Sequence, residues 1–355
     1  MFNTGNTGHI SGSYPLFLGE DLGFADSINQ PYPILEKLYD EQMGFIWNHT
    51  EVDLTQDRQD MLSLPKEVTD LMVETILWQT LADSVASRAI GSTILKYVSN
   101  PGLQDLYNAI ILFETIHSKT YLHIIRQTFV DPNGALKRGY QSLEAIKRST
   151  LLMDTFNNLL NAKDDLPTKE LRKLIMFCVV ALFLLENINF MASFAVTFAI
   201  AETGVYQGIA SNVKLIARDE MLHGRSGGEL LRILAKEWPE TFEEVRPMFK
   251  SMLDSVVSDE HAWADHLFST GRQVIGLNAK LLKDYVDYMA IPVASILGVN
   301  FSGPKENPLP YMDSWLDSSK TQAAAQEIQL TNYLLNSIKS SSEEEIDSVL
   351  RKYAC

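Results

Sequence analysis

Glu114–His117 (sequence ETIH) and Glu220–His223 (EMLH) are two copies of a Glu-x-x-His motif in separate helical stretches of the chain. Each copy follows an isolated acid in an apolar stretch, Asp83 before the first and Glu186 before the second, at distances of 31 and 34 residues. That distance fits one helix, a turn and part of the next helix, so the chain contains two similar helix pairs. Residues i and i+3 of a helix lie on one face, so each Glu and His can bind the same ion.

Four carboxylates and two imidazoles form the ligand set of a dinuclear iron or manganese centre in a four-helix bundle, with an aspartate here in place of one glutamate. A lone Glu-x-x-His pair is usually a solvated pair of side chains. These acids occur among apolar residues, where carboxylates are rarely buried unless they are paired or bound to a metal. Oxygen-rich ligands with one imidazole per metal favour iron or manganese over zinc. The predicted ligands are Asp83, Glu114, His117, Glu186, Glu220 and His223.

The helical pattern runs with little interruption from about Pro65 to Ala290, which predicts an all-α protein with a four-helix bundle core inside a larger helical bundle. We expect an irregular, mobile N-terminal arm over residues 1–30, the helical domain over 31–317 and a mobile C-terminal tail over 318–355. Residues 55–64 are expected to form a connector. The predicted helices cover about 33–47, 65–99, 103–129, 135–162, 168–203, 207–236, 239–270 and 278–297.

Composition limits the possible partners and compartments. The 355 residues are 46% hydrophobic, enough for a large core, and the net charge of -15 argues against nucleic acid and anionic membranes as partners. The N-terminus is polar and Gly-rich, without the pattern of a signal peptide. The two cysteines, Cys178 and Cys355, give no disulfide framework or Cys-x-x-Cys motif, which suits a reducing cytoplasm.

One stretch resembles a membrane span. Between Leu174 and Ala201 the only charged residue is Glu186, and the length would cross a bilayer. Glu186, Asn187 and Asn189 would be costly in lipid. We therefore favour a helix buried on all sides in a soluble bundle.

Tyr121 stands four residues after His117, so it shares the face of the first motif one turn away. A tyrosine at such a position is often a plain packing residue. Phe190, Phe194 and Ile216, at helical spacing from Glu186 and Glu220, would form an apolar pocket on the same helices. A phenol beside an oxygen-activating metal pair is placed to lose a proton and an electron, and an apolar pocket would slow quenching of the radical.

Several motifs together resemble the small, radical-generating subunit of class I ribonucleotide reductase. They are Trp47 with Glu51, Gln79–Ser84 (QTLADS), Glu114–Tyr121 (ETIHSKTY) and Ala217–His223 (ARDEMLH). The likeness extends from about Phe24 to Tyr333 and includes Asn307–Pro310 (NPLP) and Gln326-Glu327.

The resemblance implies a ferritin-like fold and a role for each motif residue. One metal would be bound by Asp83, Glu114 and His117, and the other by Glu186, Glu220 and His223, with bridging carboxylates between them. Tyr121 matches the radical tyrosine. Asp219 would hydrogen-bond His117 and link it to Trp47, forming the inner part of a route for electrons and protons.

The resemblance also implies cofactors and partners. Two iron ions per chain are expected, with a dimanganese centre as the alternative, together with molecular oxygen, a homodimer and a separate large catalytic subunit. Tyr333 matches the tail tyrosine that relays the radical to that subunit, and Glu51 and Glu327 match acids implicated in the relay. Ribonucleotide reduction needs thiols that Cys178 and Cys355 cannot credibly supply, so the partner would supply them.

The chain departs from the best-known bacterial pattern at three places. Ile110 stands where many relatives have a tryptophan, Ala325 stands where proline is common, and the tail ends in Lys352–Cys355 (KYAC). Two rivals share the ligand set. A desaturase or hydrocarbon monooxygenase would need an open substrate pocket and no Trp47–Asp219 link, and an iron-storage protein would lack the apolar cage around Tyr121.

Overall fold

The computed structural model describes residues 3–23, 29–269, 271–272 and 274–317. Over these residues the predicted all-α class is confirmed, because their only β-type pairings are two isolated bridges, Phe17–Val98 and Val274–Leu277. The elements are α1 (Gly8–Ser11), α2 (Pro33–Gly44), α3 (Thr55–Ser63), α4 (Lys66–Ser92), the 3-10 helix η1 (Ile94–Tyr97), α5 (Pro101–Thr128), α6 (Pro132–Gly139), α7 (Leu143–Leu160), α8 (Thr168–Leu184), the π-helix η2 (Leu185–Asn189), α9 (Phe190–Ala201), α10 (Gln207–Glu237), α11 (Pro239–Phe268), α12 (Ala279–Leu297) and α13 (Pro310–Trp315).

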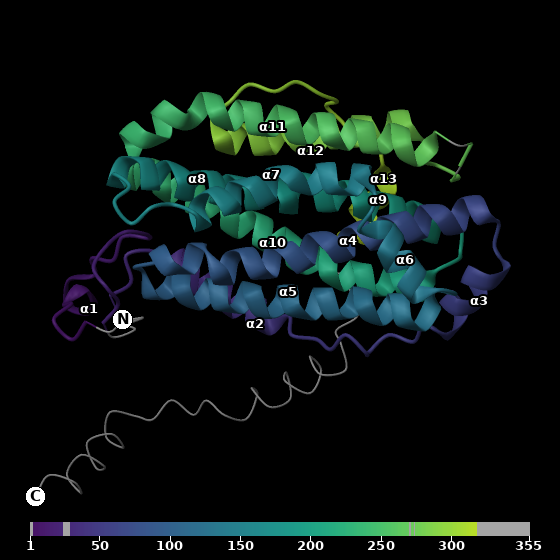
Figure 1. Cartoon of the computed structure of the whole chain (residues 1–355), viewed down its shortest axis with the longest axis horizontal. Helices are drawn as coiled ribbons and strands as arrows, with labels where there is room; N and C mark the ends of the chain where they lie inside the picture. The colour runs from purple at the N-terminus through teal and green to yellow at the C-terminus, as the bar shows by residue number, and fades with distance from the viewer. Residues whose placement is uncertain (1–2, 24–28, 270, 273, 318–355) are drawn as a thin grey trace, which may run out of the picture.

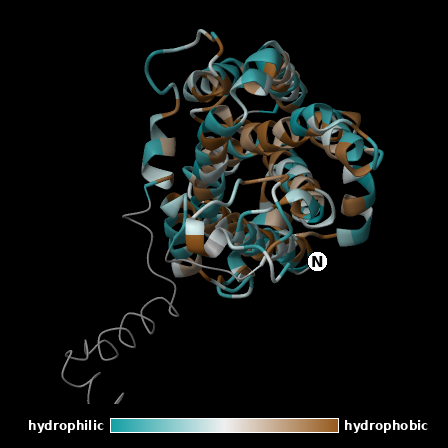
Figure 2. Cartoon of the chain, turned by 90° about the vertical axis from the view of Figure 1, so that its left-hand side faces the viewer, coloured by the Kyte–Doolittle hydropathy of each residue, from teal (hydrophilic) through white to brown (hydrophobic). Residues whose placement is uncertain are grey.

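Four helical segments form the core bundle: α4, α5, the continuous run α8–η2–α9, and α10. Among them α4 packs on α5 and α9, and α10 packs on α8, η2 and α9. Figure 1 shows α11 and α12 as an outer layer on one side and α2 beside α5 on the other. Figure 2 shows the hydrophobic residues gathered where helices face one another. The core bundle is therefore shielded on both sides.

Local sequence signals define several helix ends. The side chain of Asn100 accepts a hydrogen bond from Leu103 N and precedes Pro101, the first residue of α5. Ser142 caps α7 in the same way, by accepting from Ala145 N. This cap follows a turn after Gly139, so the single helix predicted over 135–162 is instead two helices, α6 and α7.

The long apolar stretch lies inside the bundle. The run Thr168–Ala201 is long and apolar enough to span a membrane, but 83% of its most apolar window is buried within the protein. Its middle is the π-helix η2, which contains Glu186. A Cβ atom on Gly224 of α10 would lie 2.6 Å from the side chain of Asn187. Glycine therefore allows α10 and η2 to approach closely, which brings Glu186 next to the second motif.

The expected connector over residues 55–64 is wrong, because Thr55–Ser63 forms helix α3. Buried Asp57 and Asp60 explain the difference. Asp57 Oδ1 accepts a 2.8 Å hydrogen bond from Ile209 N, and Asp60 Oδ2 accepts one of the same length from Tyr206 N. Both carboxylates thus accept hydrogen bonds from N–H groups at the start of α10 that have no partner within that helix. Because α10 is distant in sequence from residues 55–64, the local pattern does not indicate α3.

The N-terminal arm is anchored where the structure describes it. Leu16 and Phe17 are buried, and Leu16 N donates a 3.1 Å hydrogen bond to Glu237 Oε1 at the end of α10. Phe17 pairs with Val98 after η1. Residues 14–17 are therefore part of the packed domain. The predicted tail, residues 318–355, lies outside the described residues.

Candidate metal centre

The six predicted ligands converge at the middle of the core bundle, and all six are buried. Asp83 comes from α4, Glu114 and His117 from α5, Glu186 from η2, and Glu220 and His223 from α10. Their ligand atoms form two groups of four, and within each group they lie within 4.8 Å of one another. One group is Asp83, Glu114, His117 and Glu220, and the other is Glu114, Glu186, Glu220 and His223. Glu114 and Glu220 belong to both groups, the arrangement that two bridging carboxylates require.

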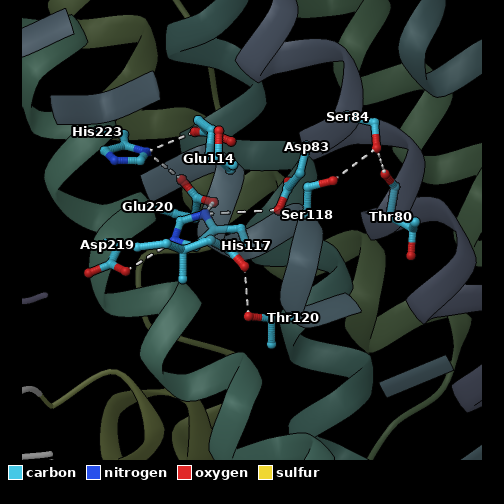
Figure 3. A network of polar contacts seen from close by, with 12 residues as sticks. Thr80, Asp83, Ser84, Glu114, His117, Ser118, Thr120, Asp219, Glu220 and His223 are labelled. Carbon is cyan, nitrogen blue, oxygen red and sulfur yellow. Dashed lines mark hydrogen bonds and ion pairs between the residues drawn. The ribbon is translucent and has the colours of Figure 1, made fainter. Parts of the chain in front are cut away.

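Glu220 lies between the two histidines (Figure 3). His117 Nδ1 is 2.9 Å from Glu220 Oε1, and His223 Nδ1 is 2.7 Å from Glu220 Oε2. His223 Nδ1 is also 3.0 Å from Glu114 Oε1. Both imidazoles therefore turn Nδ1 towards the carboxylates, and each oxygen of Glu220 faces a different histidine.

Burial and mutual repulsion shift the pKa values of the carboxyl groups. Burial, with Glu114 and Glu220 nearby, raises the pKa of Asp83 well above its usual range. Burial, with the same two neighbours, does the same to the pKa of Glu186. Glu220 is the exception, because the two histidines outweigh its burial and lower its pKa. Without metal, the cluster therefore keeps protons on several groups.

The residues present fit a pair of divalent cations. Among the described residues, both carboxylate oxygens of Asp83 and Oε2 of Glu114 are buried without a hydrogen-bond partner. Buried acceptors of this kind are costly unless a cation or donor satisfies them. Two overlapping oxygen-rich groups, each with one imidazole, suit iron or manganese.

Tyr121 lies fully buried on α5, one turn after His117, and its hydroxyl has no hydrogen-bond partner among the described residues. Burial, followed by the charge of Asp83 and the other carboxylates, raises the pKa of Tyr121 well above its usual value. The hydroxyl is therefore close to the cluster and shielded from water. Phe190, Phe194 and Ile216 are also fully buried, and the two phenylalanine rings stack with centroids 5.7 Å apart.

Asp219 joins the cluster to Trp47. Trp47 Nε1–H donates a 2.8 Å hydrogen bond to Asp219 Oδ2, and His117 Nε2 lies 3.0 Å from the same oxygen. Because His117 Nδ1 faces the metal ligands, Nε2 carries the proton and donates. Arg218, which the sequence did not single out, donates from Nη2 to Phe45 O at 2.7 Å and so fixes the loop that leads to Trp47.

Comparisons with known proteins identify the family. The profile of the family described as "Ribonucleotide reductase, small chain" matches residues 27–302. The ribonucleoside-diphosphate reductase subunit beta of Haemophilus influenzae is 32% identical over 349 residues, which cover 92% of this chain and 93% of that protein. The chain belongs to the ribonucleotide reductase small-chain family. The resemblance inferred from the motifs is thereby confirmed.

Solved structures of this family share the fold. The R2 subunit of ribonucleotide reductase from Clostridium botulinum superposes with a TM-score of 0.78, at 19% identity, over 85% of this chain and 94% of that chain. The dimanganese(II)-NrdF of Streptococcus sanguinis superposes with a TM-score of 0.69, at 18% identity, over 80% and 96%. At these identities the likeness establishes the ferritin-like fold alone.

Ile110 lies beside the second group of candidate ligands. It is 5% exposed and lines a cavity of about 20 Å³ that also contacts Glu186 and His223. The other lining residues are mostly apolar. An isoleucine has no donor for Glu186, so this side of the site is an apolar wall.

The outer relay residues are only partly described. Glu51 is exposed, and its Oε1 accepts a 2.9 Å hydrogen bond from Asn48 N. It therefore lies on the surface of the loop that follows Trp47. Tyr333 and Glu327 lie outside the described residues, so their roles remain predictions.

Metal loading should release protons. Asp83 and Glu186 have raised pKa values, and although burial lowers the pKa of His223, Glu220 and Glu114 raise it to about 9. Metal requires the deprotonated groups, so apparent affinity should fall as pH falls from about 9, by roughly tenfold per pH unit for each proton released. Titration calorimetry of the metal-free protein with Mn²⁺, in buffers of different ionisation enthalpy, counts these protons. An affinity independent of pH between 6 and 9 would contradict this protonation pattern.

Proposed function

We propose that the six ligands hold a di-iron centre, with dimanganese as the alternative, and that Tyr121 stores a radical that passes to a large catalytic subunit. Family membership makes the activity that of ribonucleoside-diphosphate reductase, an oxidoreductase of deoxyribonucleotide biosynthesis. The observation that carries the proposal is the pair of overlapping four-ligand groups beside the buried, unpartnered hydroxyl of Tyr121.

The metal site and Tyr121 have different parts in forming the radical. When bound, the reduced metal pair supplies the oxidising power of molecular oxygen. Tyr121 gives up one electron together with its hydroxyl proton, which the neighbouring carboxylate cluster can accept. Its burial keeps water and reductants from the phenoxyl oxygen. A radical formed there can therefore persist.

Trp47, Asp219 and His117 offer a route for the radical away from the cluster. Oδ2 of Asp219 accepts hydrogen bonds from both rings, so it can take the indole proton when Trp47 loses an electron. Trp47 is 3% exposed and precedes the surface loop that carries Glu51. The route thus begins at a metal ligand and ends near the surface.

The cavity beside the metals argues against the closest rival. A desaturase or hydrocarbon monooxygenase must admit its substrate next to the metal pair. The cavity that reaches Glu186 and His223 has a volume of about 20 Å³, room for little more than one water molecule and too small for a fatty-acyl or hydrocarbon substrate. The fully buried residues Phe190, Phe194 and Ile216, expected to form the apolar cage of Tyr121, argue against an iron-storage protein.

The reducing thiols must come from another chain. Cys178 is buried, burial raises the pKa of its thiol, and Cys355 lies outside the described residues. A large subunit that docks on the C-terminal tail would supply them, and the chain itself would act as a cytoplasmic homodimer. This assignment of partners extends the family resemblance.

Electron paramagnetic resonance tests the core of the proposal. The metal-free chain, loaded with ferrous iron and exposed to air, should show a tyrosyl signal, and elemental analysis should find two metals per chain. Metal binding without any organic radical, under iron or manganese, would refute radical storage.

Two changes in the tail should show that radical transfer and binding of the large subunit depend on different tail residues. Tyr333→Phe should retain the metals, the Tyr121 radical and binding of a matched large subunit, yet lose nucleotide reduction, because phenylalanine cannot carry the radical. Deleting residues 336–355 should weaken binding at least tenfold, since it removes Ile346, Val349 and Leu350 but leaves Tyr333. Turnover and pull-down affinity measure the two effects. Substantial turnover by Tyr333→Phe would refute the predicted role of Tyr333. Unchanged affinity of the shortened chain would refute the predicted role of residues 336–355 in binding the large subunit.

A further inference from the structure

Three of the four buried tryptophans, Trp47, Trp78 and Trp263, differ in what surrounds their indole rings. Trp47 Nε1–H donates to the carboxylate of Asp219. In the described part of the chain, Nε1 of Trp78 and Nε1 of Trp263 are buried with no hydrogen-bond acceptor. Of these three, only Trp47 donates its indole proton to a carboxylate, which can accept that proton when the ring is oxidised.

Arg148 of α7 lies between the two indoles that lack an acceptor. The carbon at the centre of its guanidinium group is 3.5 Å from the ring centroid of Trp78 and 4.7 Å from that of Trp263. Glu260 holds the guanidinium with two hydrogen bonds, Nε to Oε1 at 2.7 Å and Nη2 to Oε2 at 2.8 Å. An arginine stays charged in proteins, so both rings carry a fixed positive charge on one face.

Trp78 and Arg148 lie close to the predicted radical site. Trp78 precedes Asp83 by five residues on α4, about 7.5 Å along the helix axis. Its ring centroid is 5.4 Å from that of Phe190. Arg148 Nη2 also donates to Asn189 O of η2, three residues after Glu186. Trp78 is thus an oxidisable side chain close to the cluster, on a different helix from Tyr121.

Trp263 extends the arrangement towards solvent. Its ring stacks on His266 with centroids 5.6 Å apart. His266 is partly exposed and lines a cavity of about 350 Å³ together with Arg272 and Lys66. If Trp78 and Trp263 were easily oxidised, they would connect the radical site to the surface by a second path that does not include Trp47.

We propose that Arg148 prevents Trp78 and Trp263 from being oxidised, so that the oxidising equivalent stays on Tyr121 and leaves only through Trp47. The inference rests on the proposed function. A cation on the ring face disfavours an indole radical cation, because removing an electron places a second positive charge beside the first. Among the described residues, neither Nε1 has an acceptor, so no protein base is in place to take the proton of such a radical cation.

The side reaction that Arg148 prevents is a one-electron reduction of the Tyr121 radical by Trp78. Trp78 would give one electron to the Tyr121 phenoxyl radical, and the proton that Tyr121 released on oxidation would return to its oxygen. Tyr121 would then be an intact tyrosine, and Trp78 a radical cation. A second exchange between Trp263 and Trp78 would move the radical towards His266 and the solvent.

Stability alone is a weak reason for this buried ion pair. Apolar side chains of similar volume often replace a buried Arg–Glu pair at no cost in stability. Arg148 and Glu260 are both fully buried, and Asn189 Nδ2 donates a further 2.6 Å hydrogen bond to Glu260 Oε1. The network fixes the position of the guanidinium between the rings, which is what the proposed role requires.

The test removes the positive charge of Arg148 together with the negative charge of Glu260, but keeps hydrogen-bonding side chains at both positions. In the full chain, Arg148→Gln combined with Glu260→Gln should shorten the lifetime of the Tyr121 radical by roughly tenfold or more and give a transient tryptophan radical signal. Adding Trp78→Phe should restore the lifetime, because phenylalanine is not oxidised there. Arg148→Lys, which keeps a cation, should retain more of the radical than the neutral pair. Electron paramagnetic resonance measures the radicals, and circular dichroism and metal content are checked for each variant.

Trp78→Phe alone is the control that does not depend on the stability of the neutral pair, and it should leave radical yield and lifetime unchanged. A longer lifetime in this variant would overturn the inference, because Trp78 would then be supplying electrons to the Tyr121 radical even with Arg148 in place. An unchanged lifetime in the neutral pair, or a loss that Trp78→Phe does not restore, would also overturn it. Absence of a tyrosyl signal in the unsubstituted chain would instead overturn the proposed function, and this inference with it.

Discussion

Tyr121→Phe should bind two metals per chain and react with oxygen, yet show no stable tyrosyl radical and no measurable nucleotide reduction. The substitution removes one hydroxyl, which has no hydrogen-bond partner among the described residues, so packing and the ligand cluster should be unaffected. Phenylalanine is far harder to oxidise than tyrosine, and no proton can leave its ring. The storage step is therefore lost although the metals remain.

The matched control is Tyr285→Phe on α12. Tyr285 is also buried, and burial with the neighbouring Asp313 and Tyr288, rather than the carboxylate cluster, raises its pKa. This variant should keep the tyrosyl signal and the activity with a matched large subunit. A normal tyrosyl signal in Tyr121→Phe would show that another tyrosine carries the radical, and its loss in Tyr285→Phe would point to that residue.

The six candidate metal ligands could be selected from the sequence because their signal is local. Residues i and i+3 share a helix face, and a lone acid in an apolar helix has few uses other than a metal or an ion pair. These two facts selected six residues that the structure brings together. The link between Trp47 and Asp219 came instead from the family resemblance, because no spacing rule connects residues so far apart in sequence.

Features that depend on tertiary partners could not be predicted. Helix α3 is weakly amphipathic, and the N–H groups that satisfy Asp57 and Asp60 lie about 150 residues later in the chain. The π-helix at Glu186 interrupts a stretch whose composition indicates plain α-helix, and it packs closely on Gly224. In each case the deciding contact is absent from the local sequence.

Arg148 illustrates the same limit at the candidate site. In sequence it is one charged residue in a helix with polar and apolar positions, and such residues are usually exposed. Its buried partner, Glu260, is 112 positions away, and both indoles lie on other helices. The sequence signal that could have indicated its burial is the spacing of Ala145, Arg148 and Leu152, which share one face of α7.

Glu220→Ala should lose both metals, because Glu220 is a ligand in both four-atom groups and each of its oxygens faces one of the histidines. Removing an outer partner of a metal ligand already lowers affinity by roughly 10–100-fold, so loss of a shared ligand should cost more. His117→Ala should weaken binding in the same direction but remove a ligand from one group only. The helices should still form, since the apolar core is unchanged.

Glu229→Ala is the control on the same helix. Glu229 is outside both ligand groups and pairs with Arg232 near the surface, so this variant should bind two metals with normal affinity. Elemental analysis after gel filtration gives the metal content, and far-UV circular dichroism reports the helices. If Glu220→Ala kept two metals per chain, Glu220 would not be the bridging ligand. If Glu220→Ala lost its helices as well, the interaction of Glu220 with His117 and His223 would be needed for the stability of the metal-free bundle.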